Sequence, residues 1–180
     1  MKHRDELLKL LVTHALKKGD FTLASGAKST YYINGKQCSL DARGSYLIAR
    51  IMLAMIADDI PNAVGGLSLG ADPIVGSMLA LAGMEDLALK GFMVRKEQKD
   101  HGTKSLVEGP VSEGDRVVIV EDVITTGGSS MKAIRAVEEM GCTVSKVIVV
   151  VDRQQGAREN LAKEGYHLES IFTVDELLNA

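Results

Sequence analysis

The sequence has few cysteines and lacks long apolar runs, the features of disulfide-rich and membrane-spanning proteins. It has 180 residues, of which two are cysteines, three are prolines, none is tryptophan and 4% are aromatic. Cys38 and Cys142 form neither a CxxC pair nor a zinc-binding spacing, so we interpret them as buried thiols in a reducing compartment. No stretch approaches the ~20 apolar residues that cross a bilayer, and the charged N-terminus does not resemble a signal peptide. The sequence therefore predicts a cytoplasmic protein without a membrane partner.

An excess of positive charge is also missing. The chain carries 21 Lys+Arg against 24 Asp+Glu, a net charge of -3, which argues against a nucleic-acid partner. Hydrophobic residues make up 46% of the chain, enough for a sizeable core. Because domains usually contain about 100–200 residues, we expect one domain over residues 1–180.

The N-terminal third has mixed periodicity. Apolar residues at helical spacing predict an amphipathic helix over residues 2–18. Residues 21–35 read as a short β-hairpin around a Ser-Gly turn, and residues 44–59 return to a helical pattern. Residues 1–43 are therefore expected to form a small unit, a helix followed by a hairpin, beside the main body.

From residue 62 the pattern becomes strand, loop and helix in alternation. Near-continuous β-branched runs at 116–120 and 147–151 are typical of parallel strands buried on both faces. Residues 95–109 lack periodicity and are too long for a simple connection, which favours a functional loop. The alternation predicts an α/β fold with a mainly parallel central sheet flanked by helices. The remaining predicted strands are 63–69, 87–94 and 168–171, and the helices are 74–82 (with Asp72 as its cap), 127–140, 157–164 and 174–179.

The densest chemical signal is the strand at 116–120 with the residues that follow it. Glu121 and Asp122 come at the carboxyl end of the strand, where open parallel sheets bind ligands. The small, hydroxyl-rich turn at 125–129 then enters a helix, and its N–H groups, hydroxyls and helix dipole suit a phosphate. Because carboxylates repel phosphate, the acidic pair better suits ribose hydroxyls or a Mg²⁺ ion. A sugar phosphate satisfies both halves, although the string could also be a capped helix that closes a βα loop.

A second cluster lies in the predicted loop. Arg95, Lys96, Lys99, His101 and Lys104 are concentrated there in an otherwise acidic chain. Such a run is often a solvated face. Beside a diphosphate ligand, however, these cations could stabilise the negative charge of a departing pyrophosphate.

The acidic pair and its turn resemble the phosphoribosyl-diphosphate (PRPP) motif of the type I phosphoribosyltransferases. The resemblance implies that Glu121 and Asp122 contact the ribose hydroxyls and that the following turn binds the 5-phosphate. Glu121 departs from the aspartate that many members carry. The PRPP-binding residues that it implies in this stretch are Glu121, Asp122, Val123, Ile124, Thr125, Thr126, Gly127, Gly128 and Ser129.

The basic loop resembles the catalytic loop of the orotate phosphoribosyltransferases. That resemblance implies that Arg95, Lys96, Lys99 and His101 bind PRPP, with Lys99 and His101 reaching into the site of a partner subunit. It therefore implies a homodimer, and Lys99, His101 and Asp122 as the catalytic residues.

Other matches concern the base. The hairpin is similar to the family's N-terminal hood, which implies that Tyr32 and Ile33 pack on orotate, with Thr125 also in contact. Arg153 matches the arginine that binds the orotate carboxylate, a pairing that the guanidinium fork favours. Two departures are Ala24 and the Gly70-Ala71 pair, where some members carry lysines.

Taken together, the resemblance implies transfer of the phosphoribosyl group of PRPP to N1 of orotate, giving orotidine 5′-phosphate and pyrophosphate in the synthesis of UMP. It implies Mg²⁺ as cofactor, with no protein side chain assigned as its ligand. Two alternatives stay open, namely a phosphoribosyltransferase for another base and a nucleotide-sensing regulatory protein on the same fold.

Overall fold

The core of the molecule is a six-stranded sheet of order β5-β4-β3-β6-β7-β8. A computed structural model describes residues 2–22, 28–97 and 106–180. All pairs in this sheet are parallel except β4 with β5, so the predicted α/β fold with a mainly parallel sheet is confirmed. The strands are β3 (Ala63–Leu67), β4 (Lys90–Val94), β5 (Val107–Glu108), β6 (Arg116–Ile124), β7 (Thr143–Asp152) and β8 (Leu168–Thr173).

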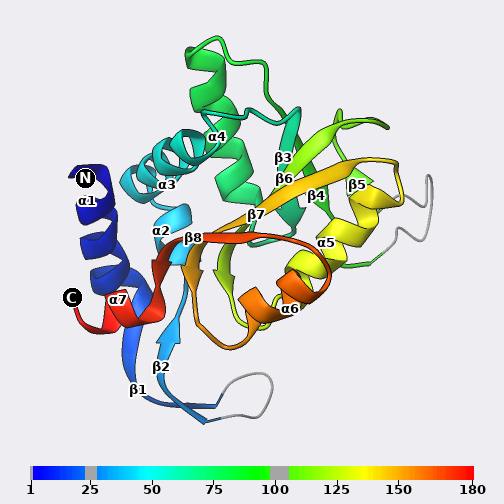
Figure 1. Cartoon of the computed structure of the whole chain (residues 1–180). Coiled ribbons are helices and arrows are strands. Elements are labelled where there is room, and N and C mark those ends of the chain that lie inside the picture. The colour runs from blue at the N-terminus through cyan, green and yellow to red at the C-terminus, as the bar shows by residue number, and fades with distance from the viewer. Residues whose placement is uncertain (1, 23–27, 98–105) are drawn as a thin grey trace.

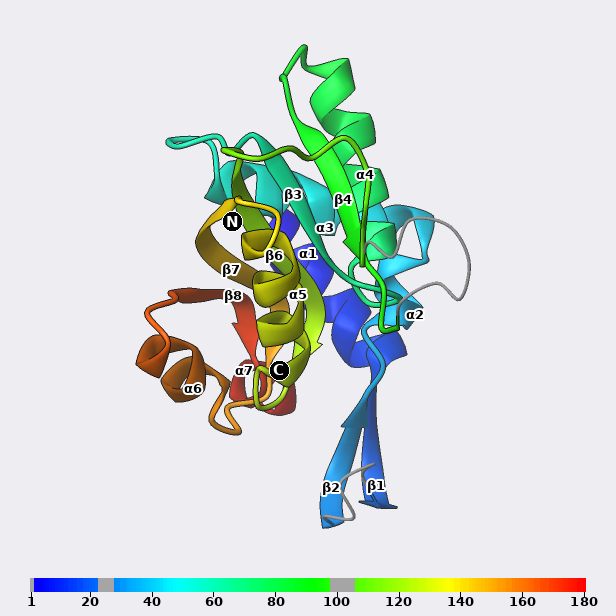
Figure 2. The same ribbon diagram turned by 90° about the vertical axis from the view of Figure 1, so that its right-hand side faces the viewer.

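Helices cover both faces of this sheet (Figures 1 and 2). Side chains alternate across a strand, so Val118 and Val120 of β6 join one core while Val117 and Ile119 join the other. The first core is covered by α1 (Lys2–Leu10), α3 (Ala42–Met55), α4 (Asp72–Met84) and α7 (Val174–Leu178), and the second by α5 (Gly128–Glu138) and α6 (Ala157–Lys163). None of the helices among the described residues is long and apolar enough to span a membrane.

The N-terminal segment contains a helix and a hairpin that projects from the body (Figure 2). After α1, a π-helical turn η1 (Leu11–Ala15) leads into β1 (Leu16–Thr22), which pairs antiparallel with β2 (Lys28–Ile33). The predicted helix over 2–18 is therefore wrong at its end, because residues 16–18 pair with residues 31–33. Leu16 is buried in the strand as it would be in a helix, so the apolar pattern does not mark the change.

Other boundaries also differ from the prediction. Strand β6 continues to Ile124 because the longer β7 pairs with it as far as Asp152, so the acidic pair lies inside the strand and not after it. The N-cap of α4 is Ala71, not Asp72, whose Oδ1 instead accepts a hydrogen bond from Ser68 Oγ at 3.0 Å. Strand β5 forms in the predicted loop, and the short helix α2 (Lys36–Ser39) was not predicted.

Candidate active site

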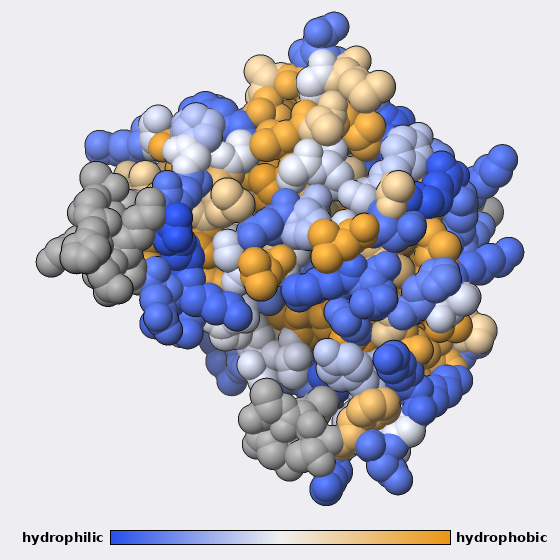
Figure 3. Space-filling model, turned by 180° about the vertical axis from the view of Figure 1, so that it is seen from behind, coloured by the Kyte–Doolittle hydropathy of each residue, from blue (hydrophilic) through white to orange (hydrophobic). Residues whose placement is uncertain are grey.

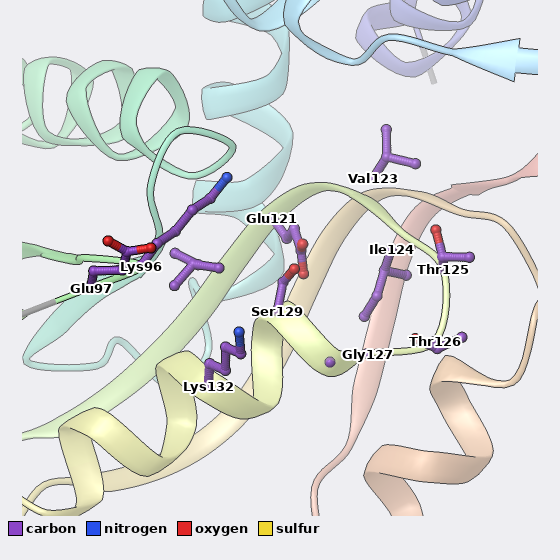
Figure 4. A pocket seen from close by; sticks show the side chains of 12 residues that line it. Lys96, Glu97, Glu121, Val123, Ile124, Thr125, Thr126, Gly127, Ser129 and Lys132 are labelled. Carbon is purple, nitrogen blue, oxygen red and sulfur yellow. The ribbon is translucent and has the colours of Figure 1, made fainter. Parts of the chain in front are cut away.

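A cavity of about 580 Å³ opens at the carboxyl ends of β3 and β6 (Figure 4). Most of the predicted PRPP-binding residues of β6 and its turn line this cavity. Lys96, from the segment after β4, lines it as well. Glu97 and Lys132 of α5 were not predicted there. The lining residues are Leu67, Lys96, Glu97, Glu121, Val123, Ile124, Thr125, Thr126, Gly127, Gly128, Ser129 and Lys132.

The turn between β6 and α5 presents the start of a helix to this cavity. Gly127 is the N-cap of α5 and has φ 88°, a left-handed conformation that favours glycine. The first N–H groups of an α-helix have no partner within the helix. Because Gly128 and Ser129 line the cavity, these donors and the positive end of the helix dipole make it suitable for an anion such as phosphate.

Glu121 has an unusual electrostatic environment. Burial raises the pKa of its carboxyl from 4.5 to about 7, and the charge of Asp122 acts in the same direction. A hydrogen bond from Ser130 Oγ to Glu121 Oε2 opposes this rise. Ser130 is only 2% exposed, and the residues predicted to bind PRPP ended one position before it, at Ser129.

Asp122 is held from several sides. Its Oδ2 lies 3.0 Å from Lys36 Nζ, and its Oδ1 accepts a hydrogen bond from the backbone N–H of Val123 at 3.0 Å. A Cβ at Gly70 would lie 2.7 Å from Asp122 Oδ1, and one at Gly35 would lie 2.9 Å from Asp122 Cβ. The glycine at position 70, a departure noted in the sequence, thus lets this loop approach the carboxylate. Lys36 escaped prediction because no local pattern links it to a residue so far along the chain.

A second cavity, of about 590 Å³, adjoins the first and shares Lys96 and Glu97 with it. It is lined on one side by Ser68, Leu69 and Asp72 of the β3–α4 loop. Arg95 lines it too, and its Nε donates to Glu108 Oε1 at 3.1 Å. The structure thus brings Arg95 and Lys96 to the site, whereas Lys99 and His101 lie outside the described residues.

Arg153 is buried next to the turn, with an exposed fraction of 8%. Its backbone N–H donates to the carbonyl of Ile124 at 3.0 Å. Its guanidinium carbon lies 5.0 Å from the centroid of the Tyr31 ring. Its Nε and Nη2 atoms are buried and find no hydrogen-bond partner in the part of the chain that is described. A buried cation with free donors suits an anionic ligand that reaches it through the site.

The predicted base-binding residues of β2 lie on two sides of that strand. Ile33 is buried, whereas Tyr32 is 42% exposed and packs on Phe21 with 5.7 Å between ring centroids. Tyr31, which we did not predict, is the residue that contacts Arg153. Period-two alternation explains why neighbouring tyrosines have different surroundings, but the sequence does not show which one faces inward.

Residues 43–176 match the family described as the phosphoribosyl transferase domain. The chain is 47% identical to an orotate phosphoribosyltransferase of Rhodopirellula baltica, over 93% of this chain and 90% of that protein. It is 44% identical to the one of Aquifex aeolicus, over 99% of both.

Solved structures agree with the sequence matches. The crystal structure of Mycobacterium tuberculosis orotate phosphoribosyltransferase in complex with PRPP superposes with a TM-score of 0.82 at 35% identity, covering 97% of this chain and 98% of that one. The chain therefore belongs to the phosphoribosyltransferase family, within its orotate phosphoribosyltransferase branch.

Proposed function

We propose that this protein is an orotate phosphoribosyltransferase, which transfers the phosphoribosyl group of PRPP to N1 of orotate. The products are orotidine 5′-phosphate and pyrophosphate, a step in the synthesis of UMP. The identity of about 45% to orotate phosphoribosyltransferases over nearly the whole chain supports this activity. The observation that carries the choice of base is Arg153, a buried arginine with unpartnered donors beside the phosphate-binding turn.

PRPP would lie along the two adjoining cavities. The turn at 125–129 would bind the 5-phosphate, and Glu121 and Asp122 would accept hydrogen bonds from the ribose hydroxyls. The diphosphate would then reach the second cavity, between the β3–α4 loop and the side chains of Arg95 and Lys96. Lys132 and Lys96 add positive charge on opposite walls of the first cavity (Figure 4).

Orotate would be selected through its carboxylate. Arg153 offers two parallel N–H groups to the carboxylate oxygens, while Tyr32, Ile33 and Thr125 would contact the ring. The hairpin of β1 and β2 would act as a hood over the base. Adenine, hypoxanthine and uracil carry no carboxylate, so they would leave the guanidinium buried and unpaired.

The reaction needs positioning and charge stabilisation more than covalent help from the protein. Orotate N1 loses its proton and forms a bond to the anomeric carbon as the bond from that carbon to the diphosphate oxygen breaks, and in the net reaction that proton ends on the released pyrophosphate. The bonding pair leaves with pyrophosphate, whose growing charge Arg95, Lys96, Lys99 and His101 would stabilise. Exclusion of water protects the oxocarbenium-like sugar from hydrolysis.

A Mg²⁺ ion fits the chemistry of this site. Glu121 and Asp122 supply hard carboxylate oxygens beside the proposed ribose position, which suits Mg²⁺. Among the described residues no group of three or more His, Cys, Asp or Glu could hold a metal ion by itself. When bound, the ion would draw charge from the leaving group.

We also propose a homodimer in which Lys99 and His101 complete the partner's site. The exposed large hydrophobic side chains include Leu69 and Met93, which line the second cavity. Apolar side chains also gather over the upper part and centre of the face in Figure 3.

A cytoplasmic location agrees with two cysteines that are both free and buried.

The decisive experiment is an absorbance assay of orotate consumption with PRPP and Mg²⁺, run beside adenine, hypoxanthine and uracil. Turnover of orotate alone is the expected result. Turnover of another base would keep the PRPP site and contradict the assigned base pocket. PRPP binding without turnover of any base would favour the nucleotide-sensing regulatory protein.

A further inference from the structure

Ser130 makes a buried contact that the proposed reaction does not yet explain. It lies in the first turn of α5, is 2% exposed, and donates its hydroxyl proton to Glu121 Oε2. Serines at helix starts commonly cap the helix, but the N-cap of α5 is Gly127 and receives no side-chain hydrogen bond. The Ser130 hydroxyl is therefore engaged by Glu121 and does not cap the helix.

The contact determines how Glu121 can be oriented. A glutamate has one more rotatable bond than an aspartate, so its carboxylate has more positions to choose from. Ser130 engages Oε2 from the α5 side, and Ser129 hydrogen-bonds the same carboxyl group, so α5 holds Glu121 within the cavity that it lines. Figure 4 shows the Glu121 and Ser129 side chains pointing toward each other across the same space.

We infer that Ser130 is a positioning residue that fixes the Glu121 carboxylate where it can accept hydrogen bonds from the ribose hydroxyls of PRPP. The inference rests on the proposed function and deepens it. Glu121 and Ser130 then act as a pair, in which the serine compensates for the longer acidic side chain. A shorter aspartate at position 121 would not need, or reach, this hydroxyl.

Several charged groups lie around Glu121 and Ser130 and act on the Glu121 carboxyl group together with the Ser130 hydrogen bond. Asp122 lies next to Glu121 on β6, Lys36 of α2 pairs with Asp122, and Lys132 of α5 lines the cavity. Lys96 and Glu97 line it from the segment after β4. Burial is the main cause that raises the pKa of Glu121 to about 7, and the Ser130 hydrogen bond is the largest opposing influence.

The test is a double-mutant cycle on PRPP affinity, read by calorimetry with Mg²⁺ and without orotate at pH 6.5, 7.5 and 8.5. Ser130→Ala should raise the Kd for PRPP about tenfold at pH 7.5, because a hydrogen bond to a charged group is lost. In a Glu121→Asp background the same change should alter the Kd less than about twofold, since no contact remains to lose.

Matched variants separate positioning from packing. Ser145 of β7 donates its hydroxyl to the Val117 carbonyl at 3.2 Å, away from the site. Ser145→Ala should therefore leave the Kd for PRPP unchanged. Ser130→Cys keeps the volume with a weaker donor and should bind PRPP with intermediate affinity. An equal loss from Ser130→Ala in both backgrounds, at every pH, would overturn the inference. Failure of the wild-type protein to bind PRPP would instead contradict the proposed function.

Discussion

At the residue scale, the most informative side chain is Arg153. It is buried, it lies against Tyr31, and two of its donor atoms have no partner among the described residues. Such an arrangement is unfavourable for an arginine alone and becomes favourable when a carboxylate pairs with it. The arginine therefore links the local chemistry to the choice of base more directly than the phosphate-binding turn, which any phosphoribosyltransferase needs.

Replacing Arg153 should affect orotate and not PRPP. We expect Arg153→Ala to lower kcat/KM for orotate by roughly 100-fold, because a charge-assisted bidentate contact is lost. Arg153→Lys keeps the charge but lacks the two parallel N–H groups of the guanidinium. Its kcat/KM for orotate should lie between those of wild type and Arg153→Ala. Steady-state kinetics with each substrate varied in turn measure this. If Arg153→Ala raised the KM for PRPP as much as the KM for orotate, the assignment of Arg153 to the orotate carboxylate would be contradicted.

Glu121 should make the free protein less stable as pH rises. Its folded-state pKa of about 7 is above the ordinary 4.5, so between these values the folded protein binds more protons than the unfolded chain. The free energy of unfolding therefore falls across that window, and the loss is complete above pH 7. Glu121→Gln should be about 1–3 kcal/mol more stable than wild type at pH 8 and little different near pH 4.5.

Urea unfolding without ligand at pH 4.5 and pH 8 measures this difference. Glu97→Gln, which changes an exposed carboxylate of the same cavity, is the control and should show no comparable gain. A Glu121→Gln advantage that is equal at both pH values would show that packing, and not titration, is responsible. The stabilised variant should still bind PRPP more weakly, since an amide is a poorer acceptor than a carboxylate.

At the element scale, local pattern predicts most of the fold and part of the site. The strand cores, the α5 helix and the turn at 125–129 have strong periodicity or composition, and the structure contains them. Element ends were missed where pairing decides them, as at residues 16–18 of β1 and at Glu121 and Asp122 inside β6. Lys36 and Ser130 were missed because their partners are chosen by tertiary contact, on which single-sequence patterns carry no information.

The turn between β6 and α5 should depend on the glycine at its N-cap. Gly127 has φ 88°, a conformation that costs an alanine about 1–2 kcal/mol. Gly127→Ala should therefore lower the free energy of unfolding by that amount and weaken PRPP binding. Gly76→Ala on α4 is the control, because its Cβ would meet nothing within 4 Å and a helical alanine is favoured by about 0.5–1 kcal/mol.

Urea unfolding and PRPP titration together decide this prediction. A loss of stability without a loss of PRPP affinity would mean that the turn recovers its shape when the ligand binds. Equal stability of Gly127→Ala and wild type would contradict the strained left-handed conformation itself.

At the scale of the whole molecule, the proposed chemistry requires more than one chain. Arg95 and Lys96 reach the cavities from their own chain, while Lys99 and His101 are expected to act on the partner's site. A heterodimer of a Lys99→Ala chain and an Asp122→Asn chain tests this. If Lys99 acts in trans, one of the two sites combines an intact Asp122 with an intact Lys99.

The purified heterodimer, made with two affinity tags, should then regain about half of the wild-type activity, whereas each variant homodimer should be nearly inactive. If Lys99 acted within its own chain, both sites of the heterodimer would carry a defect and no activity would return. A heterodimer of the Lys99→Ala chain with a wild-type chain has one intact site in either arrangement, so its half activity controls for assembly. Restoration in the first pair therefore depends only on which chain supplies the lysine, and it would make dimerisation a requirement of the chemistry and not only of stability.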